Sequence, residues 1–334
     1  MSAVGPAPAA DARGARVVFM GSPAWAVPSL DALARAAPAL GAEIVGVFSQ
    51  PDKPAGRRRS LQACPVKTAA GVLGLPVFTP ARIRAAEAQG ELRRLAPDLI
   101  VVCAYGQIFP RAMLDLPPLG CYNLHFSRLP RWRGASPIQA AILAGDATTG
   151  VCLQRMVEAL DAGPLAAQSA PVAIGPDDTA GTLGARLAGV SAALLRDALP
   201  RLLTGSVVLT PQDAAGVTTC RTLRKEDGAV DFATESARQL ERRVRAYQPW
   251  PGCHCFLGAR RIGLAGVEVA DDAPGEPPTA SPPGVILPGG RVATAAGFIR
   301  LRRVTPEGKA PMTWEAFAHG NPQALGAKLT PAPV

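Results

Sequence analysis

The feature that most constrains the fold of this chain is an alternation of short apolar runs with helix-like stretches over residues 16–207. Residues 16–20 (RVVFM) end at a Gly-Ser-Pro turn. A stretch with apolar residues at helical spacing follows, and residues 44–48 form a second apolar run. Short apolar runs joined by amphipathic helices are typical of buried strands in a parallel sheet. The pattern therefore predicts an α/β domain that opens strand–helix–strand.

The same alternation continues along the first domain. Further strands are expected at 98–103, 120–125 and 150–156, and helices at 66–73, 82–95, 136–144 and 178–203. This order predicts a doubly wound, mainly parallel, Rossmann-like sheet over residues 16–207. The first turn reads GSPAWA and not GxGxxG. It therefore lacks the glycines that let a backbone approach a pyrophosphate, and a dinucleotide cofactor is disfavoured.

The pattern changes after Leu209. Residues 210–220 are polar and rich in turn residues, so we place a linker at 208–224. A helix expected at 234–247 is followed by short strand-like runs separated by Gly and Pro, which predict a small, OB-like β-barrel domain over 225–334. Residues 1–15 are rich in Ala, Pro and Gly without the apolar stretch of a signal peptide, and we expect them to be a disordered leader.

The sequence also disfavours several classes of protein. No apolar run approaches the ~20 residues that a membrane-spanning helix needs, so no membrane partner is expected. The seven cysteines are an odd number and several lie inside strand-like runs, which favours the reduced thiols of a cytoplasmic protein over a disulfide framework. The run Cys253-His254-Cys255 has no second ligand pair at zinc-finger spacing, so we expect no metal site.

The charge balance points to an anionic partner. The chain has 35 Lys and Arg against 26 Asp and Glu, a net charge of +9. Part of the surplus is concentrated in a Pro- and Gly-containing loop with no acid between its first and last basic residues: Lys53, Arg57, Arg58, Arg59 and Lys67. Such a loop is suited to binding phosphates of a nucleic acid, and a solvated basic loop is the alternative. Residues 221–261 are also more basic than acidic.

Residues 120–137 (GCYNLHFSRLPRWRGASP) carry the strongest chemical signal. Asn123 and His125 lie two apart, so on a strand their side chains share a face, next to a loop where open α/β sheets bind ligands. Histidine can move a proton near neutral pH, and an Asn amide can stabilise an oxyanion, which together suit acyl transfer. Asp161, in a turn after the strand expected at 150–156, is the candidate carboxylate that orients the histidine. Taken singly, each residue also has a structural explanation.

The sequence resembles a known enzyme family in this region. Residues 123–146, with TGV at 149–151 and LDAG at 160–163, closely resemble the 10-formyltetrahydrofolate-dependent formyltransferases. The members that act on initiator methionyl-tRNA are indicated by four further stretches: 17–33, 49–67, 240–252 and the run ending in Gly308-Lys309-Ala310. The resemblance implies formyl transfer from 10-formyltetrahydrofolate to the α-amine of methionine on that tRNA. It implies no metal, and we expect a monomer.

The resemblance also implies roles for single residues. Asn123, His125 and Asp161 match the catalytic positions of the family. The folate-contacting loop corresponds to Ser127, Arg128, Leu129 and Pro130. Arg128 stands where the family usually has an apolar residue, and Ala162 and Pro164 also depart from the usual pattern.

Two other functions are compatible with parts of this pattern. One is a folate-dependent formyltransferase acting on a small amine, such as a nucleotide sugar or a ribonucleotide. Such an enzyme has no need of the basic loop or the basic second domain. The other is a catalytically inert RNA-binding protein, against which the presence of Asn123, His125 and Asp161 argues.

Overall fold

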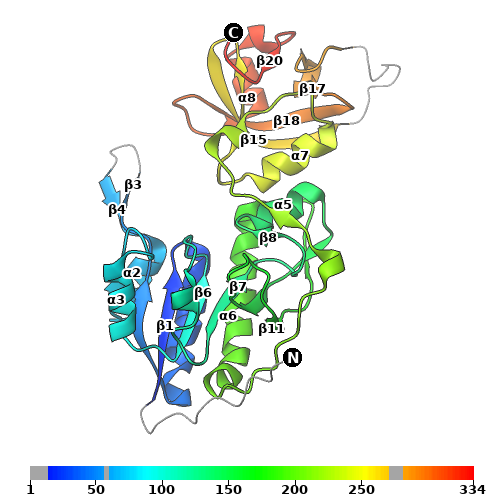
Figure 1. Cartoon of the computed structure of the whole chain (residues 1–334). Helices are drawn as coiled ribbons and strands as arrows, with labels where there is room; N and C mark the ends of the chain where they lie inside the picture. The colour runs from blue at the N-terminus through cyan, green and yellow to red at the C-terminus, as the bar shows by residue number, and fades with distance from the viewer. Residues whose placement is uncertain (1–13, 56–59, 271–280) are drawn as a thin grey trace. The chain divides into compact units, whose positions relative to one another are not determined.

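The computed structural model describes residues 14–55, 60–270 and 281–334, and the chain divides into two compact units (Figure 1). The first unit runs to Pro137 and also includes Thr148–Ala173 and Gly184–Cys220. The second includes Ile138–Ala147, Ile174–Leu183 and Arg221–Val334. The arginines expected to bind RNA, Arg57 to Arg59, lie outside the described residues, as does the expected leader up to residue 13.

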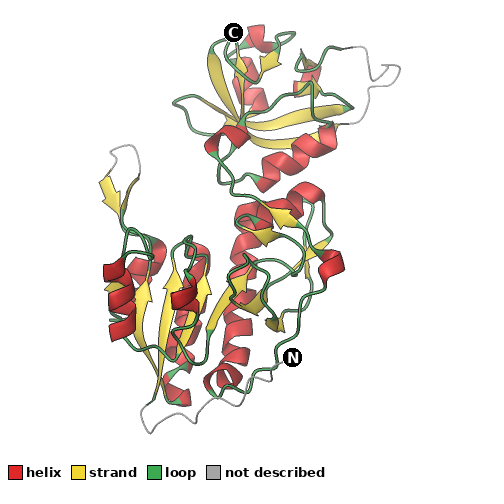
Figure 2. Ribbon diagram, viewed as in Figure 1, coloured by secondary structure: helices red, strands yellow, loops and turns green. Residues whose placement is uncertain are grey.

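The first unit is built on a seven-stranded sheet with the order β11-β10-β7-β6-β1-β2-β5 (Figure 2). The strands are β1 Ala15–Gly21, β2 Ala42–Phe48, β5 Val77–Phe78, β6 Leu99–Cys103, β7 Cys121–His125, β10 Cys152–Arg155 and β11 Leu165–Gln168. The five strands from β5 to β7 run parallel. The mainly parallel sheet is therefore confirmed, whereas β10 and β11 add an antiparallel edge.

Helices cover this sheet because its central strands are apolar on both faces. In β1, Val17 to Met20 are fully buried, and all five residues of β6 are buried or nearly so. A parallel strand buried on both faces needs a layer of helices on each side. The helices that begin in or cross into this unit are α1 Val27–Ala36, α2 Pro65–Val72, α3 Ala86–Arg94, α4 Arg111–Leu114, α5 Pro137–Ala144 and α6 Ala180–Leu203.

Short two-stranded pairings complete the first unit. They are the hairpin β3 Lys53–Ala55 with β4 Ser60–Gln62, β9 Thr148–Thr149 with β12 Val172–Ala173, and β8 Arg133–Gly134 with β13 Thr219–Cys220. The last of these matters for the site. It places residues that follow α6 directly beside the loop that follows β7.

The second unit contains a closed sheet of antiparallel strands. In order along the sheet they are β16 Ile286–Leu287, β17 Arg291–Ala293, β18 Phe298–Pro306, β15 Arg260–Ala270, β14 Cys253–Leu257 and β20 Leu329–Thr330, with β19 Met312–Thr313 on β18. A bridge between Val285 and Lys328 joins the two outer strands. The sheet thus closes on itself, and the expected small β-barrel is confirmed.

Two helices accompany the barrel, α7 Ala237–Ala246 and α8 Trp314–His319. The predicted helix at 234–247 begins later than expected because Ser236 caps it: the Ser236 hydroxyl accepts from the Gln239 amide, and the Gln239 side chain accepts from the Ser236 amide. Within the described ranges, no helix is long and apolar enough to cross a membrane.

Candidate active site

The site lies at the end of β7, where the polar pair of the sequence motif stands. Asn123 and His125 occupy alternate positions of this strand, so both side chains lie on one face of the sheet. The neighbouring strand β10 runs antiparallel, with Gln154 directly opposite Asn123 and Cys152 opposite His125. The side chain of His125 is 5% exposed. The strand therefore presents a buried imidazole and an amide side by side.

Asp161 completes a cluster with these two residues. Its Oδ1 atom lies 3.6 Å from Nδ1 of His125 and accepts a hydrogen bond of 3.4 Å from Nδ2 of Asn123. The Asp161 side chain is 8% exposed. The structure thus brings together the three residues that the sequence placed in one site.

The other ring nitrogen of His125 has a fixed partner. Nε2 lies 2.8 Å from the carbonyl oxygen of Trp132. Because a carbonyl oxygen only accepts, we assign the proton of the neutral imidazole to Nε2. The lone pair of Nδ1 then faces the carboxylate of Asp161.

Two glycines permit close backbone contacts around Asp161. Gly134 has φ +118°, its N–H donates to Asp161 Oδ2 at 2.8 Å, and a Cβ there would lie 2.0 Å from the carbonyl oxygen of Cys220. At Gly163, in the LDAG run, a Cβ would lie 1.7 Å from the carbonyl oxygen of Arg155. Asp161 itself has φ +51°, a conformation that Asp adopts more readily than most residues.

Two glutamines that the sequence did not single out contact Asp161. Nε2 of the buried Gln154 donates to Asp161 Oδ1 at 2.7 Å. Nε2 of Gln212 donates to the carbonyl oxygens of Asp161 at 2.9 Å and Gly163 at 2.7 Å. Gln154 ends the otherwise apolar run 151–154, and a glutamine at that position of a buried strand was a signal that the sequence offered. Gln212 lies in a turn-rich segment that gives no local signal.

A thiol also lies beside the site. Sγ of Cys220 lies 3.6 Å from the carbonyl oxygen of Trp132 and 3.5 Å from that of Arg133. Burial raises the pKa of the Cys220 thiol above its ordinary value. This thiol is therefore uncharged at neutral pH and is poorly suited to act as a nucleophile.

A cavity of about 150 Å³ opens next to Asp161. Its lining is mainly apolar with a few amides and carboxylates: Gln107, Ile108, Phe109, Leu114, Gln154, Met156, Val157, Glu158, Leu160, Asp161 and Gly163. Ile108 and Leu160 on its rim are both 62% exposed. Apolar walls with a few convergent polar groups are typical of a site for a small organic ligand.

The four residues expected to contact folate follow β7 directly, and none of them lines this cavity. The hydroxyl of the fully buried Ser127 donates to the carbonyl oxygen of Arg131 at 2.6 Å. Arg128 donates to the carbonyl oxygen of Ser169 at 3.0 Å. Leu129 is buried and Pro130 is partly buried.

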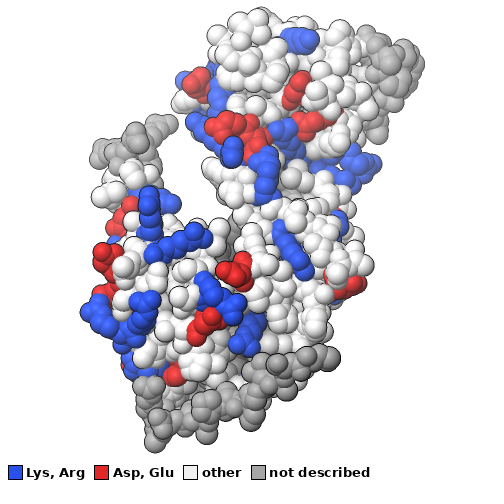
Figure 3. Space-filling model, in the orientation of Figure 1, with Lys and Arg blue, Asp and Glu red and all other residues white. Residues whose placement is uncertain are grey.

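The described part of the basic loop carries less free charge than the sequence indicated. Lys53 is exposed on β3. Lys67, by contrast, forms an ion pair with Asp52, with Nζ 2.7 Å from Oδ1 and 2.9 Å from Oδ2. On the face drawn in Figure 3, basic and acidic side chains lie interspersed over both units.

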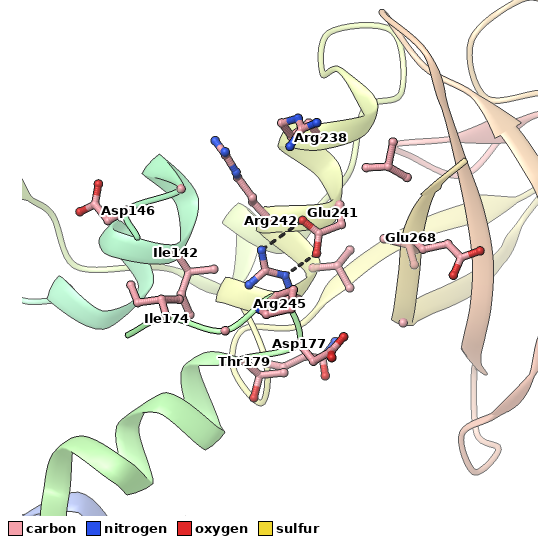
Figure 4. A pocket seen from close by; sticks show the side chains of 18 of the residues that line it. Ile142, Asp146, Ile174, Asp177, Thr179, Arg238, Glu241, Arg242, Arg245 and Glu268 are labelled. Carbon is pink, nitrogen blue, oxygen red and sulfur yellow. Dashed lines mark hydrogen bonds and ion pairs between the residues drawn. The ribbon is translucent and has the colours of Figure 1, made fainter. Parts of the chain in front are cut away.

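A second cavity, of about 700 Å³, lies within the second unit among α5, α7, β15 and the segment before α6 (Figure 4). Arg245 forms an ion pair with Glu241 and donates to the carbonyl oxygen of Asp178 at 3.0 Å. Arg242 donates to the last carbonyl of α5, that of Ala144, at 3.2 Å. These two arginines hold α7 in place. Since four carboxylates and three arginines line the cavity, it has no positive excess.

Comparisons with known sequences point to one family. The formyl transferase family model matches residues 15–199, and the model of the formyl transferase C-terminal domain matches residues 222–322. Methionyl-tRNA formyltransferase of Halorhodospira halophila is 46% identical over 307 residues, 92% of this chain and 96% of that protein. The protein of the same name from Symbiobacterium thermophilum is 43% identical over 318 residues, 95% of each chain.

Solved structures show the same fold in more distant proteins. The sugar 3N-formyltransferase WlaRD superposes with a TM-score of 0.63 at 15% identity, covering 89% of this chain and 99% of that one. An N-formyltransferase from Helicobacter canadensis gives a TM-score of 0.62 at 15% identity, with coverages of 85% and 98%. At this identity the likeness concerns the fold alone.

Proposed function

The chain belongs to the formyl transferase family in both its N-terminal and its C-terminal part, and we propose from this premise that it formylates initiator methionyl-tRNA. The donor is 10-formyltetrahydrofolate, and the product is the N-formylmethionyl-tRNA that starts translation. The observation that carries this proposal is the set of relatives named methionyl-tRNA formyltransferase, 46%, 43% and 42% identical over at least 92% of this chain.

The reaction forms one C–N bond and breaks another. The uncharged amine of methionine attacks the formyl carbon, and the formyl oxygen becomes an oxyanion in a tetrahedral intermediate. The bond between the formyl carbon and N10 of the folate then breaks. Over the whole reaction one proton passes from the amine to N10. The protein must therefore stabilise an oxyanion and move a proton.

Asn123 is suited to stabilise the oxyanion. Its amide hydrogen bond to Asp161 is 3.4 Å long, near the weak end of the range. The amide can therefore turn to donate to the oxygen that gains charge, at small cost. A donor that acts on the transition state more strongly than on the ground state lowers the barrier.

His125 and Asp161 are suited to move the proton. With Nε2 bonded to the Trp132 carbonyl, Nδ1 is the nitrogen free to take up a proton. The carboxylate of Asp161, 3.6 Å away, stabilises the imidazolium that results. The imidazolium then gives this proton to N10 of the folate as N10 leaves.

The folate donor would approach through the cavity beside Asp161. Its apolar walls, with Phe109 and Leu160, suit a flat heterocycle, and the amide of Gln107 suits the polar edge of such a ring. We assign the loop Ser127–Pro130, which leaves β7 at His125, to the support of the donor.

The tRNA would meet the basic hairpin. Lys53 is exposed there, and Arg57 to Arg59 follow it in sequence. We assign these residues to the phosphate backbone and give Lys67 a smaller part, because Asp52 already balances its charge. A protein that acts on charged tRNA works where translation occurs, and seven free cysteines suit the cytoplasm.

A formyl-transfer assay with three acceptors tests the function. Purified protein and 10-formyltetrahydrofolate are offered charged initiator tRNA, free methionine or an amino sugar nucleotide. We expect turnover with the charged tRNA, and at most traces with the other two. Turnover of the sugar amine alone would overturn the proposal in favour of a small-amine formyltransferase.

A further inference from the structure

Asp161 stands at the end of a chain of hydrogen bonds that begins at Arg133. Two guanidinium nitrogens of Arg133 donate to Oε1 of Gln212 at 3.0 and 2.8 Å. Nε2 of Gln212 lies 3.3 Å from Oε1 of Gln154, and Nε2 of Gln154 donates to Asp161 at 2.7 Å. Resting on the function proposed above, we propose that Arg133, Gln212 and Gln154 form a relay that positions the Asp161 carboxylate during formyl transfer.

The chemistry of the two ends fixes the orientation of both amides. A guanidinium group only donates, so the oxygen of Gln212 must face Arg133. A carboxylate only accepts, so the nitrogen of Gln154 must face Asp161. The amide dipoles then align from a cation at one end to an anion at the other. Hydrogen bonds aligned in this way in a poorly hydrated site polarise and strengthen one another.

Gln154 restrains the oxygen that matters for His125. Its side chain is 1% exposed, and its Nε2 atom donates a hydrogen bond to Oδ1 of Asp161, the oxygen that faces Nδ1 of the imidazole. The N–H of Gly134 holds the other oxygen at 2.8 Å. A carboxylate held at both oxygens cannot rotate about its terminal bond, so its distance from His125 is fixed.

Gln212 restrains the backbone that carries this carboxylate. The two hydrogens of its amide are shared among three acceptors: the carbonyl oxygens of Asp161 at 2.9 Å and Gly163 at 2.7 Å, and Oε1 of Gln154 at 3.3 Å. Asp161 has a left-handed backbone with φ +51°, a conformation that neighbouring contacts must hold in place. Gln212 thus ties the turn 161–163 to the segment that follows α6.

Replacement of Gln154 by Met tests the relay directly. Gln154→Met keeps the length of the side chain and removes the donor. We expect kcat to fall about tenfold while both Michaelis constants stay within about threefold, because a misplaced carboxylate weakens the transition state more than substrate binding. Gln168→Met is the matched control. Gln168 is exposed on β11 and bonds only to Cys152 in the described residues, so we expect no change in kcat.

Three further variants separate positioning from packing. Gln212→Met should lower kcat in the same way, and Gln154→Met combined with Gln212→Met should cost less than the product of the two single effects, since both act through Asp161. For Gln154→Glu, the ratio of its kcat to that of the wild type should rise as pH falls from 8 to 6, because only the protonated acid of the variant donates to Asp161. The titratable and charged groups around position 154 in this test are Asp161, His125 and, through Gln212, Arg133. A packing effect has no such pH dependence.

The amide proton of Gly134 gives a readout besides activity. It is bonded to Asp161 Oδ2, so its NMR chemical shift should move in Gln154→Met and stay in Gln168→Met. An unchanged Gly134 signal in Gln154→Met, or wild-type kcat in Gln154→Met of an active enzyme, would overturn the relay. Absence of turnover in the wild type would instead overturn the proposed function, and the Gly134 signal would still decide the relay.

Discussion

The carbonyl oxygen of Trp132 accepts a hydrogen bond of 2.8 Å from Nε2 of His125 and so decides which ring nitrogen meets Asp161. Trp132 has φ +62°, an uncommon backbone conformation for a large side chain. The loop after β7 thus stores local strain where it fixes the tautomer of the imidazole. In the proposed mechanism the transferred proton is therefore taken up at Nδ1.

His125 and Asp161 should act as one unit. We expect His125→Ala and Asp161→Asn each to lower kcat by about 10²–10⁴, the usual range for the loss of a general acid–base group. The double variant should be little worse than either single one, because each change disables the same proton transfer. Filter-binding of charged tRNA should be unchanged in all three. Full activity of His125→Ala would remove the role assigned to it.

Gly134→Ala should damage the site through the backbone. The new Cβ would lie 2.0 Å from the carbonyl oxygen of Cys220, and the alanine backbone would have to adopt φ +118°. We expect the free energy of unfolding to fall by about 1–3 kcal/mol, and kcat to fall as the N–H leaves Asp161. The matched control is Gly74→Ala, at φ +68° with nothing within 4 Å. Equal losses of activity in both variants would contradict a specific role for Gly134.

The arginines of the basic loop should contribute to tRNA binding through charge. Replacing Arg57, Arg58 and Arg59 by Ala should weaken binding and reduce the slope of log Kd against log salt by about 2–3, since each phosphate contact contributes close to one. The exposed arginines Arg84, Arg93 and Arg94 provide a control of equal charge change on the same unit. If the salt slope stays unchanged, the loop is a solvated surface.

Asp227 should make the second unit sensitive to acid. The bond from the Arg221 guanidinium lowers the pKa of the Asp227 carboxyl to about 2. Since this pKa lies below the unfolded value of about 3.9, the stabilisation is complete above that value and is lost as pH falls toward 2. Asp227→Asn should therefore lower the free energy of unfolding by about 1 kcal/mol at pH 7, a partly exposed pair being screened by solvent.

Urea unfolding at several pH values measures this effect. The difference between wild type and Asp227→Asn should shrink below pH ~4. Asp197→Asn, in the exposed pair of Asp197 with Arg196, is the control and should change little at any pH. A difference that persists down to pH ~2 would show that the carboxylate charge is not the cause.

Four thiols should be inert in the native protein. Burial raises the pKa of Cys103, Cys121, Cys253 and Cys255 to about 12, so almost no thiolate is present at pH 8. Titration with a chromogenic disulfide should therefore leave these four unmodified until denaturant is added, when all seven cysteines react. Mass spectrometry of the modified native protein identifies the exceptions.

Local pattern was sufficient for most of the elements. Strands β1, β2, β6 and β7 and helices α2, α5, α6 and α7 lie within a few residues of the expected ranges, because periodicity and apolar runs reflect which face of each element is buried. The pairing of Asn123 with His125 followed from the two-residue repeat of a strand. The antiparallel direction of β10 did not follow, because a single apolar run reads the same in either direction.

The sequence by itself determined the alternation that makes the sheet, the barrel that follows it, and the Asn-His pair at a strand end. Only the tertiary structure decided that Gln154 and Gln212, residues 7 and 51 positions from Asp161 in the chain, hold Asp161 beside this pair. The tertiary structure also decided that Asp52 balances Lys67. The physical reason is that periodicity records which side of an element is buried, whereas hydrogen-bond partners depend on how elements distant in the chain are brought together.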